Sequence, residues 1–284
     1  LTFGLPMSIT AGMVTWMLTW WLSEAIPMAI TALLPILILS STGILPIHEC
    51  YKEYSDRFVF LFLGGFLLSL SFEKWKLHER LSHFILSKVG HSPQAILLGF
   101  MCATYLISMW ISNTATAIMM MPLAIGITNS SNQENHFFSR SLVLGIAYSA
   151  SIGGMATILG SPPNAALAGI LESQFNKEVS FFDWMIWGTP FSVLLLIITY
   201  LILKRNIKKH QEEKIHTTHW IDRKLTPLSF EQKATMTIFL LTASLWIFQQ
   251  PISSVLGNWF NDTFIALLAS ICLFIPFKEN ALLE

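Results

Sequence analysis

Residues 106–123 read LISMWISNTATAIMMMPL, an apolar stretch with Ser112, Asn113 and Thr114 at its centre. A buried amide or hydroxyl without a partner costs roughly 2–7 kcal/mol in an apolar medium. Three consecutive polar side chains therefore need partners, either from the protein or from a bound ion or molecule. Such a stretch predicts a polar site inside apolar surroundings.

The composition is typical of a protein that crosses a membrane several times. Of the 284 residues, 53% are hydrophobic and 12% are charged, and the mean hydropathy is +0.58. Soluble domains carry about 25% charged residues. Apolar runs such as 33–44, 58–72 and 191–203 leave too few polar positions for the face of a soluble helix. We therefore predict an all-α polytopic protein that contacts membrane lipid, in the cell membrane.

Charge and cysteine content argue against several other classes of protein. The formal net charge is zero, which gives no electrostatic basis for binding nucleic acid. Cys50, Cys102 and Cys272 are odd in number and far apart, without metal-ligand spacing, so we expect no disulfide framework. No apolar segment holds a nucleophile with its base, a metal-binding pair or an acid dyad, so a membrane-embedded enzyme is not expected.

The apolar segments and their boundaries give the predicted organisation. Residues 46–57 read as a polar loop, and residues 73–90 as an amphipathic helix at the membrane interface. Apolar segments are expected at 10–22, 28–44, 58–72, 93–122, 139–154, 183–203, 234–248 and 263–277. Both ends of the sequence fall within or beside such segments, so we expect a fragment of a longer protein.

Residues 204–230 form the most basic part of the chain. They hold seven of the 17 Lys and Arg residues against three acidic ones. Loops rich in Lys and Arg stay on the cytoplasmic side of a membrane. We therefore predict that this segment is a cytoplasmic linker between two membrane-embedded parts.

A second interruption occurs about fifty residues after the first, at Gly160-Ser161-Pro162-Pro163-Asn164. Two prolines remove two backbone donors, so one helix cannot run through this stretch. A lone Ser or Thr in a membrane helix usually bonds back to its own helix and has no further role. Paired interruptions, however, indicate the binding site of a transporter, where free N–H groups suit a carboxylate and free carbonyls suit Na⁺.

Four stretches resemble a known family of transporters. They are SMWISNTATAIMMMP (108–122), AYSASIGGMATILGSPPNA (147–165), WWLSEAIPMAITALLP (20–35) and FLFLGGFLLSLSFEKWKLHERL (60–81). They are similar to the divalent anion/sodium symporter family of the ion-transporter superfamily, in its bacterial dicarboxylate form. Members carry di- and tricarboxylates or sulfate across membranes.

The resemblance implies a dimeric, elevator-type transporter built from inverted repeats, each with a re-entrant hairpin and a broken helix. Residues 1–92 would form scaffold helices with the interfacial helix, and residues 93–203 the first half of the transport domain. Residues 231–284 would begin the scaffold helices of the second repeat. The family's second Ser-Asn-Thr motif is not found in this sequence, so we expect the chain to hold half of a binding site.

The resemblance also assigns site residues by position in the matching motifs. Those implied to bind Na⁺ are Ser108, Ser112, Asn113 and Gly160. Those implied to face the substrate are Asn113, Thr114, Ser161 and Pro162.

The leading hypothesis is Na⁺-coupled uptake of di- or tricarboxylates of the succinate, malate or fumarate type. An exchanger that does not use Na⁺ and a sulfate transporter remain alternatives within the same fold. A membrane sensor or a structural subunit without transport is an alternative of a different class.

Overall fold

The structure is a computed structural model that describes residues 4–90, 92–130, 136–208, 227–277 and 280–283. It divides into two compact units, Leu1–Val59 and Phe60–Glu284. Most of the predicted linker 204–230, namely residues 209–226, lies outside the described residues. Its cytoplasmic location therefore stays a prediction.

The first unit contains one long and three short helices, each with a proline as its N-cap or in its first turn. They are α1 (Leu5–Ser23), α2 (Met28–Thr31), α3 (Leu34–Ser41) and α4 (Ile47–Tyr54). The predicted helix 28–44 is divided between α2 and α3 because Pro35, in the first turn of α3, lacks an N–H and its ring clashes with the carbonyl four residues earlier.

The prediction that residues 46–57 form a loop was wrong for most of that range. Pro46 precedes a helix, α4, in which Cys50 is buried among polar neighbours. Glu49 in its first turn and Lys52 in its last turn both interact favourably with the helix dipole and so stabilise the helix. The Tyr54 hydroxyl donates to the Ala32 carbonyl. The polar residues of this segment thus lie on the exposed face of an amphipathic helix, not in a loop.

The second unit is helical apart from one pair of very short strands. Its helices include most of α5 (Arg57–Lys74), then α6 (Leu77–Val89), α7 (Pro93–Ser108), α8 (Asn113–Ser130), α9 (His136–Gly154), α10 (Pro162–Phe175), α11 (Phe181–Lys208), α13 (Phe230–Ile247), α14 (Gln249–Leu256) and α15 (Asp262–Phe274). The strands β1 (Pro276–Phe277) and β2 (Asn280–Ala281) pair antiparallel. The predicted segment 263–277 ends as a helix at Phe274 because Ile275, before Pro276, is extended.

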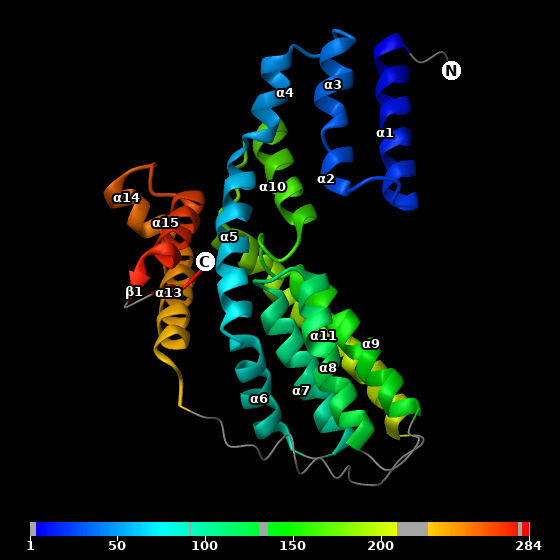
Figure 1. Cartoon of the computed structure of the whole chain (residues 1–284), viewed down its shortest axis with the longest axis vertical. Helices are drawn as coiled ribbons and strands as arrows, with labels where there is room; N and C mark the ends of the chain where they lie inside the picture. The colour runs from blue at the N-terminus through cyan, green and yellow to red at the C-terminus, as the bar shows by residue number, and fades with distance from the viewer. Residues whose placement is uncertain (1–3, 91, 131–135, 209–226, 278–279, 284) are drawn as a thin grey trace. The chain divides into compact units, whose positions relative to one another are not determined.

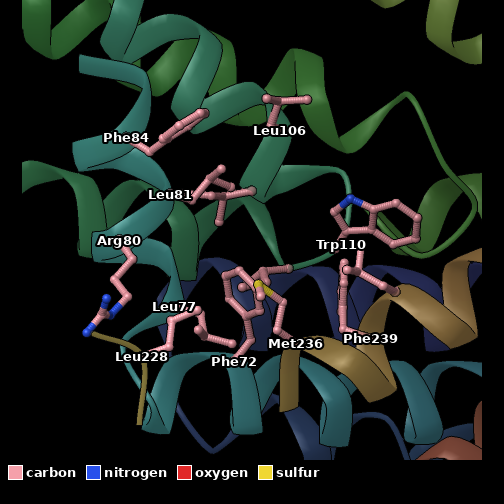
Figure 2. A pocket seen from close by; sticks show the side chains of 13 residues that line it. Phe72, Leu77, Arg80, Leu81, Phe84, Leu106, Trp110, Leu228, Met236 and Phe239 are labelled. Carbon is pink, nitrogen blue, oxygen red and sulfur yellow. The ribbon is translucent and has the colours of Figure 1, made fainter. Parts of the chain in front are cut away.

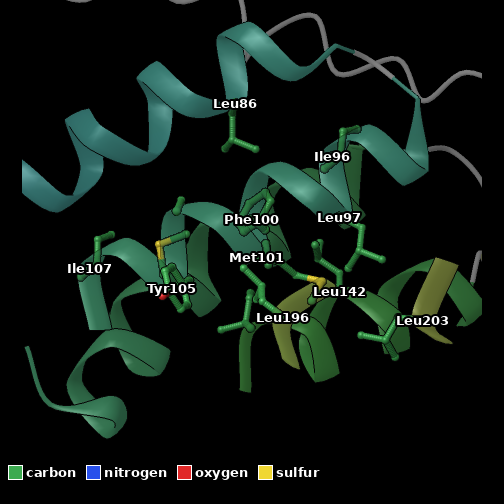
Figure 3. Packing of buried hydrophobic residues seen from close by; sticks show 14 of the residues in the cluster. Leu86, Ile96, Leu97, Phe100, Met101, Tyr105, Ile107, Leu142, Leu196 and Leu203 are labelled. Carbon is green, nitrogen blue, oxygen red and sulfur yellow. The ribbon is translucent and has the colours of Figure 1, made fainter. Parts of the chain in front are cut away.

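The core of this unit lies among α7, α8, α9 and α11, which pack on one another. Figure 3 shows Phe100 and Met101 of α7 packed beside Leu142 of α9 and Leu196 of α11. Gly145 lets α9 approach closely, since a Cβ there would lie 2.7 Å from the Leu97 side chain. This core holds the two interrupted segments in fixed positions.

Among the described residues, two stretches are long and apolar enough to span a membrane, 47–74 and 181–205. A third candidate is the pair α13 and α14, whose axes are bent by 75° relative to each other. Shorter apolar helices occur at 28–41, 93–108, 113–128 and 262–274. Of the amphipathic helix expected at 73–90, residues 77–89 form α6, with His78, Ser82 and Leu86 buried. Glu73 and Lys74 instead end α5, and Lys76 is left-handed. The place of this helix at the membrane interface stays a prediction.

Candidate functional site

The first interruption is the tip of a helical hairpin. Helix α7 ends at Ser108, Met109–Ser112 turns, and α8 begins at Asn113. The two helices contact each other, and their far ends lie at the same end of the unit (Figure 1). Ser112 begins the second arm of the hairpin, because its Oγ accepts a 3.4 Å bond from the Ala115 N–H.

The second interruption separates α9 from α10. Helix α9 ends at Gly154, residues 155–161 are irregular, and α10 begins at Pro162. Proline is favourable in the first turn, where its missing N–H would have no helical partner. Ser161, just before it, is extended. The break therefore leaves backbone carbonyls of α9 and N–H groups of α10 available for other partners.

The two interruptions are joined to each other by hydrogen bonds. The Ser108 hydroxyl donates to the Ala150 carbonyl of α9 at 2.6 Å. The Thr157 hydroxyl donates to the Met109 carbonyl and accepts from the Gly160 N–H at 3.1 Å. The irregular segment thus lies directly against the hairpin tip.

Asn164 keeps the second interruption in shape. Its Nδ2 donates to the Gly154 carbonyl and to the Thr157 carbonyl, both at 2.7 Å. Its side chain is buried. One amide at the start of α10 therefore satisfies carbonyls on both sides of the break.

Asn113 points one end of its amide into a ring of oxygen atoms. That end lies 2.9 Å from Ser108 Oγ, 3.0 Å from the Ala150 carbonyl oxygen and 3.2 Å from the Gly160 carbonyl oxygen. If it is the amide nitrogen, it donates to these oxygens. If it is Oδ1, it competes with the Ala150 carbonyl for the single Ser108 proton, and four oxygens then lie together, which is the donor set of a hard cation.

Glycines allow this close approach. A Cβ on Gly154 would lie 2.1 Å from Asn113 Oδ1, and one on Gly160 would lie 2.6 Å from the Gly154 carbonyl oxygen. A Cβ on Gly153 would lie 2.4 Å from the Tyr105 carbonyl oxygen. All three distances are below any normal contact, so a side chain on Gly153 or Gly154 would push α9 away from the hairpin, and one on Gly160 would distort the second interruption itself.

The hairpin tip is also held from three other helices. The Ser69 hydroxyl of α5 lies 2.8 Å from the Trp110 carbonyl oxygen. The Trp110 ring stacks on Phe181 of α11 and Trp246 of α13, with centroid distances of 5.8 and 6.2 Å. These contacts fix the tip before any ligand binds.

The structure brings together some of the residues assigned from the resemblance. Ser108, Asn113 and Gly160 contribute to one oxygen cluster. Ser112 instead bonds to its own helix. Thr114 and Pro162 are exposed and Ser161 is half-buried, each at or beside the N-terminus of α8 or α10.

Sequence reasoning missed the roles of Thr157, Asn164 and the Ala150 carbonyl. Asn164 closes the quoted Gly-Ser-Pro-Pro-Asn motif and could have been included. Thr157 is a single hydroxyl in an apolar stretch, and a backbone carbonyl leaves no trace in the sequence.

Residues 18–279 match the family model described as "Citrate transporter". The chain belongs to this family. It is 36% identical to the sodium-dependent dicarboxylate transporter SdcS of Staphylococcus saprophyticus, over 93% of this chain and 54% of the relative. It is 38% identical to SdcS of Staphylococcus aureus, strain NCTC 8325, over the same shares of the two proteins.

The chain therefore spans about half the length of the curated relatives that it matches, with 54% covered. The resemblance to di- and tricarboxylate transporters is confirmed. Membership in a transporter family also confirms that the chain is not an enzyme.

Proposed function

We propose that the protein couples Na⁺ to the uptake of dicarboxylates of the succinate, malate or fumarate type. The observation that supports this most directly is the oxygen cluster around Asn113. The printed names of the relatives, sodium-dependent dicarboxylate transporters, support both the ion and the substrate class.

Na⁺ would be held by Ser108, Asn113 and the Gly160 carbonyl, with the Ala150 carbonyl completing the set. Ser112, which the resemblance also assigns to this site, lies just before α8, where its Oγ accepts from the Ala115 N–H, so it would contribute less than the other three residues. Bound Na⁺ supplies a positive charge that offsets the negative charge of the substrate. The chain would supply only neutral oxygens to the ion, so no fixed negative charge would repel the substrate.

The substrate carboxylate would bind at the N-termini of α8 and α10, next to Asn113, Thr114, Ser161 and Pro162. Helix N-termini carry a partial positive charge and free N–H groups that suit anions. Asn113 belongs to both sets, so it would connect the ion to the substrate. Pro162 has no N–H and would contribute only surface.

We also propose the architecture that the resemblance implies. The hairpin α7–α8 would be re-entrant, since both of its outer ends lie on one side (Figure 1). Residues 1–92 would form scaffold and interfacial helices, 93–203 half of the transport domain and 231–284 the start of a second repeat. The transporter would be an elevator-type homodimer in the cell membrane, with residues 204–230 in the cytoplasm.

The experiment is uptake of radiolabelled succinate into proteoliposomes that contain the full-length protein. We expect uptake under an inward Na⁺ gradient and little when K⁺ replaces Na⁺. Uptake only into vesicles preloaded with dicarboxylate would show an exchanger instead. No succinate uptake, but uptake of citrate or sulfate in a parallel assay, would overturn the substrate assignment.

A further inference from the structure

Four consecutive backbone carbonyls lie where α9 ends, on residues 154–157. The last carbonyls of a helix have no partner within that helix. Asn164 of α10 binds the first and the last of the four. The two between them, on Met155 and Ala156, accept hydrogen bonds from a different helix, α11.

The donors on α11 are Trp184 and Thr189. Trp184 Nε1 donates to the Met155 carbonyl at 3.0 Å, and the Thr189 hydroxyl donates to the Ala156 carbonyl at 3.4 Å. Gly188 lets the backbone of α11 come close, since a Cβ there would lie 2.9 Å from the Met155 carbonyl oxygen and 3.1 Å from that of Ala156. The beginning of α11 is therefore fitted to these two carbonyls.

Helix α11 is itself fixed on both sides of this contact. At its N-terminus, the Phe181 N–H donates to the Asp262 carboxylate of α15 at 2.7 Å. One turn after Thr189, Ser192 Oγ lies 2.9 Å from the Tyr105 hydroxyl of α7. The two donors thus act from a helix that is anchored to its neighbours.

The hairpin tip is held by other contacts. Figure 2 shows Trp110 beside Phe239 of α13, and their ring centroids lie 5.0 Å apart. The Trp110 ring also stacks on Phe181. The hydrogen bonds of Trp184 and Thr189 therefore act on the second interruption and not on the tip.

We propose that Trp184, with a smaller contribution from Thr189, is a positioning residue that sets the ion selectivity of the proposed Na⁺ site. This role rests on the proposed function. Neither residue belongs to the oxygen cluster around Asn113. Trp184 instead holds the Met155 carbonyl on the α11 side of the break, and Thr189 does the same for the carbonyl that follows.

The effect on the ion would pass through the backbone. Without the Trp184 N–H, the Met155 carbonyl loses this partner and can turn. Gly154, just before it, lies directly against Asn113, since a Cβ there would be 2.1 Å from Asn113 Oδ1. The number, spacing and flexibility of the oxygen ligands decide which cation a site prefers. Movement of residues 154–156 would therefore change selectivity without removing any ligand.

The first measurement is hydrogen–deuterium exchange of peptides that cover residues 153–160, in full-length protein in detergent with choline in place of Na⁺. One hydrogen bond contributes about 1 kcal/mol, so Trp184→Phe should speed exchange of these peptides about fivefold. Trp187→Phe is the matched control, because Trp187 lies three residues later on α11 and is 81% exposed. Its exchange should equal that of the wild type.

The second measurement is thermal unfolding of the same proteins, titrated with NaCl or with LiCl in the absence of succinate. Trp184→Phe should raise the Na⁺ concentration for half-maximal stabilisation about fivefold and bring the ratio of the Li⁺ and Na⁺ concentrations closer to one. Thr189→Val should shift the Na⁺ concentration about twofold, because its hydrogen bond is longer. Trp187→Phe should leave both values unchanged.

Two results would overturn the proposal. One is unchanged exchange in Trp184→Phe, which would show that the indole N–H does not hold the segment. The other is faster exchange and a lower unfolding midpoint at every Na⁺ concentration, with an unchanged half-maximal concentration and an unchanged Li⁺ to Na⁺ ratio, which would show a purely structural role. Failure of the proposed transport function gives a different result, since the wild type would then take up no succinate although its stabilisation by Na⁺ still responds to Trp184→Phe.

Discussion

The two interruptions differ in the kind of polar atoms that they place inside apolar surroundings. The hairpin tip spans four residues, 109–112, and the polar atoms around it are mainly side chains, above all Ser108 and Asn113. The irregular segment spans seven residues, 155–161, and presents mainly backbone, through the Gly154, Thr157 and Gly160 carbonyls. Side-chain oxygens at the first interruption can be removed by mutation, whereas backbone carbonyls at the second can only be displaced.

Because of this difference, the side chains of the tip and the glycines of the irregular segment should have different roles. In the proposed site, side-chain oxygens would decide which ion fits, and glycine backbone would decide how closely those oxygens approach. Mutations at the tip should therefore change affinity, and mutations at the irregular segment should change whether the site forms at all.

The largest effect is expected from Gly154→Ala. The new Cβ would lie 2.1 Å from Asn113 Oδ1, so Asn113 must leave the oxygen cluster. We expect Na⁺-driven succinate uptake to fall at least 100-fold in proteoliposomes that contain equal amounts of protein. Gly12→Ala is the control, because nothing lies within 4 Å of a Cβ at that position. Uptake near wild type in Gly154→Ala would contradict the geometry of the cluster.

Next in size is Asn113→Ala, which removes the side chain and leaves Ser108 and the carbonyls without this partner. Loss of a buried polar partner costs about 1–3 kcal/mol, which corresponds to roughly a 5- to 150-fold change in affinity. The Na⁺ concentration for half-maximal uptake should rise by about that factor.

Ser112→Ala sharpens this second prediction. It removes only a long cap bond to Ala115, so a rise of less than about threefold is expected from the loss of a weak cap. An effect as large as that of Asn113→Ala would show that Ser112 also holds the ion.

A smaller effect, on stability, is expected from Thr157→Val. Valine cannot pair with the Met109 carbonyl or the Gly160 N–H, which leaves buried backbone groups unpaired at about 1–3 kcal/mol. The thermal unfolding midpoint in detergent should fall by roughly 5 °C. Thr157→Ser keeps the hydroxyl, so its unfolding midpoint should fall by much less. Equal decreases in the two variants would show that the methyl group of Thr157 matters instead.

The smallest effect concerns pH and lies away from both interruptions, at His78 on α6. Burial lowers the pKa of His78; Lys76 lowers it further, and Glu79, Glu73 and a hydrogen bond to the Phe72 backbone raise it. In the unfolded chain the pKa is about 6.5. Below that value the unfolded state takes up the proton first, so stability falls as the pH drops toward the lower folded pKa.

Thermal unfolding between pH 7.5 and 5.5 checks this. We expect a midpoint that decreases toward acid in the wild type and decreases less in His78→Gln. A His78→Gln profile as steep as the wild type would assign the pH dependence to other groups.

The sequence was sufficient to predict the interruptions but not how they meet. Two prolines and a run of polar residues in apolar sequence are local signals, and each break occurs where they predict it. The contact between Ser108 and Ala150 is set by the packing of α7 on α9, which depends on Leu97, Phe100 and Gly145 together. No local pattern encodes such a distance.

The prediction of a loop at 46–57 failed for a similar reason, because tertiary packing is not visible in single residues. Glu49, Lys52 and Glu53 look like loop residues one by one, but they share the helix α4 with the buried Cys50. The division of the 28–44 segment depended on the position of one proline within it.

The bond between Thr157 and Met109 joins residues 48 positions apart. Such a closure costs more chain entropy than a local turn. Helices α7, α8 and α9 are all synthesised before residues 155–161, which supply the second interruption. A nascent chain that ends after the hairpin therefore carries Ser108 and Asn113 but lacks the Ala150, Thr157 and Gly160 atoms that surround them in the folded protein.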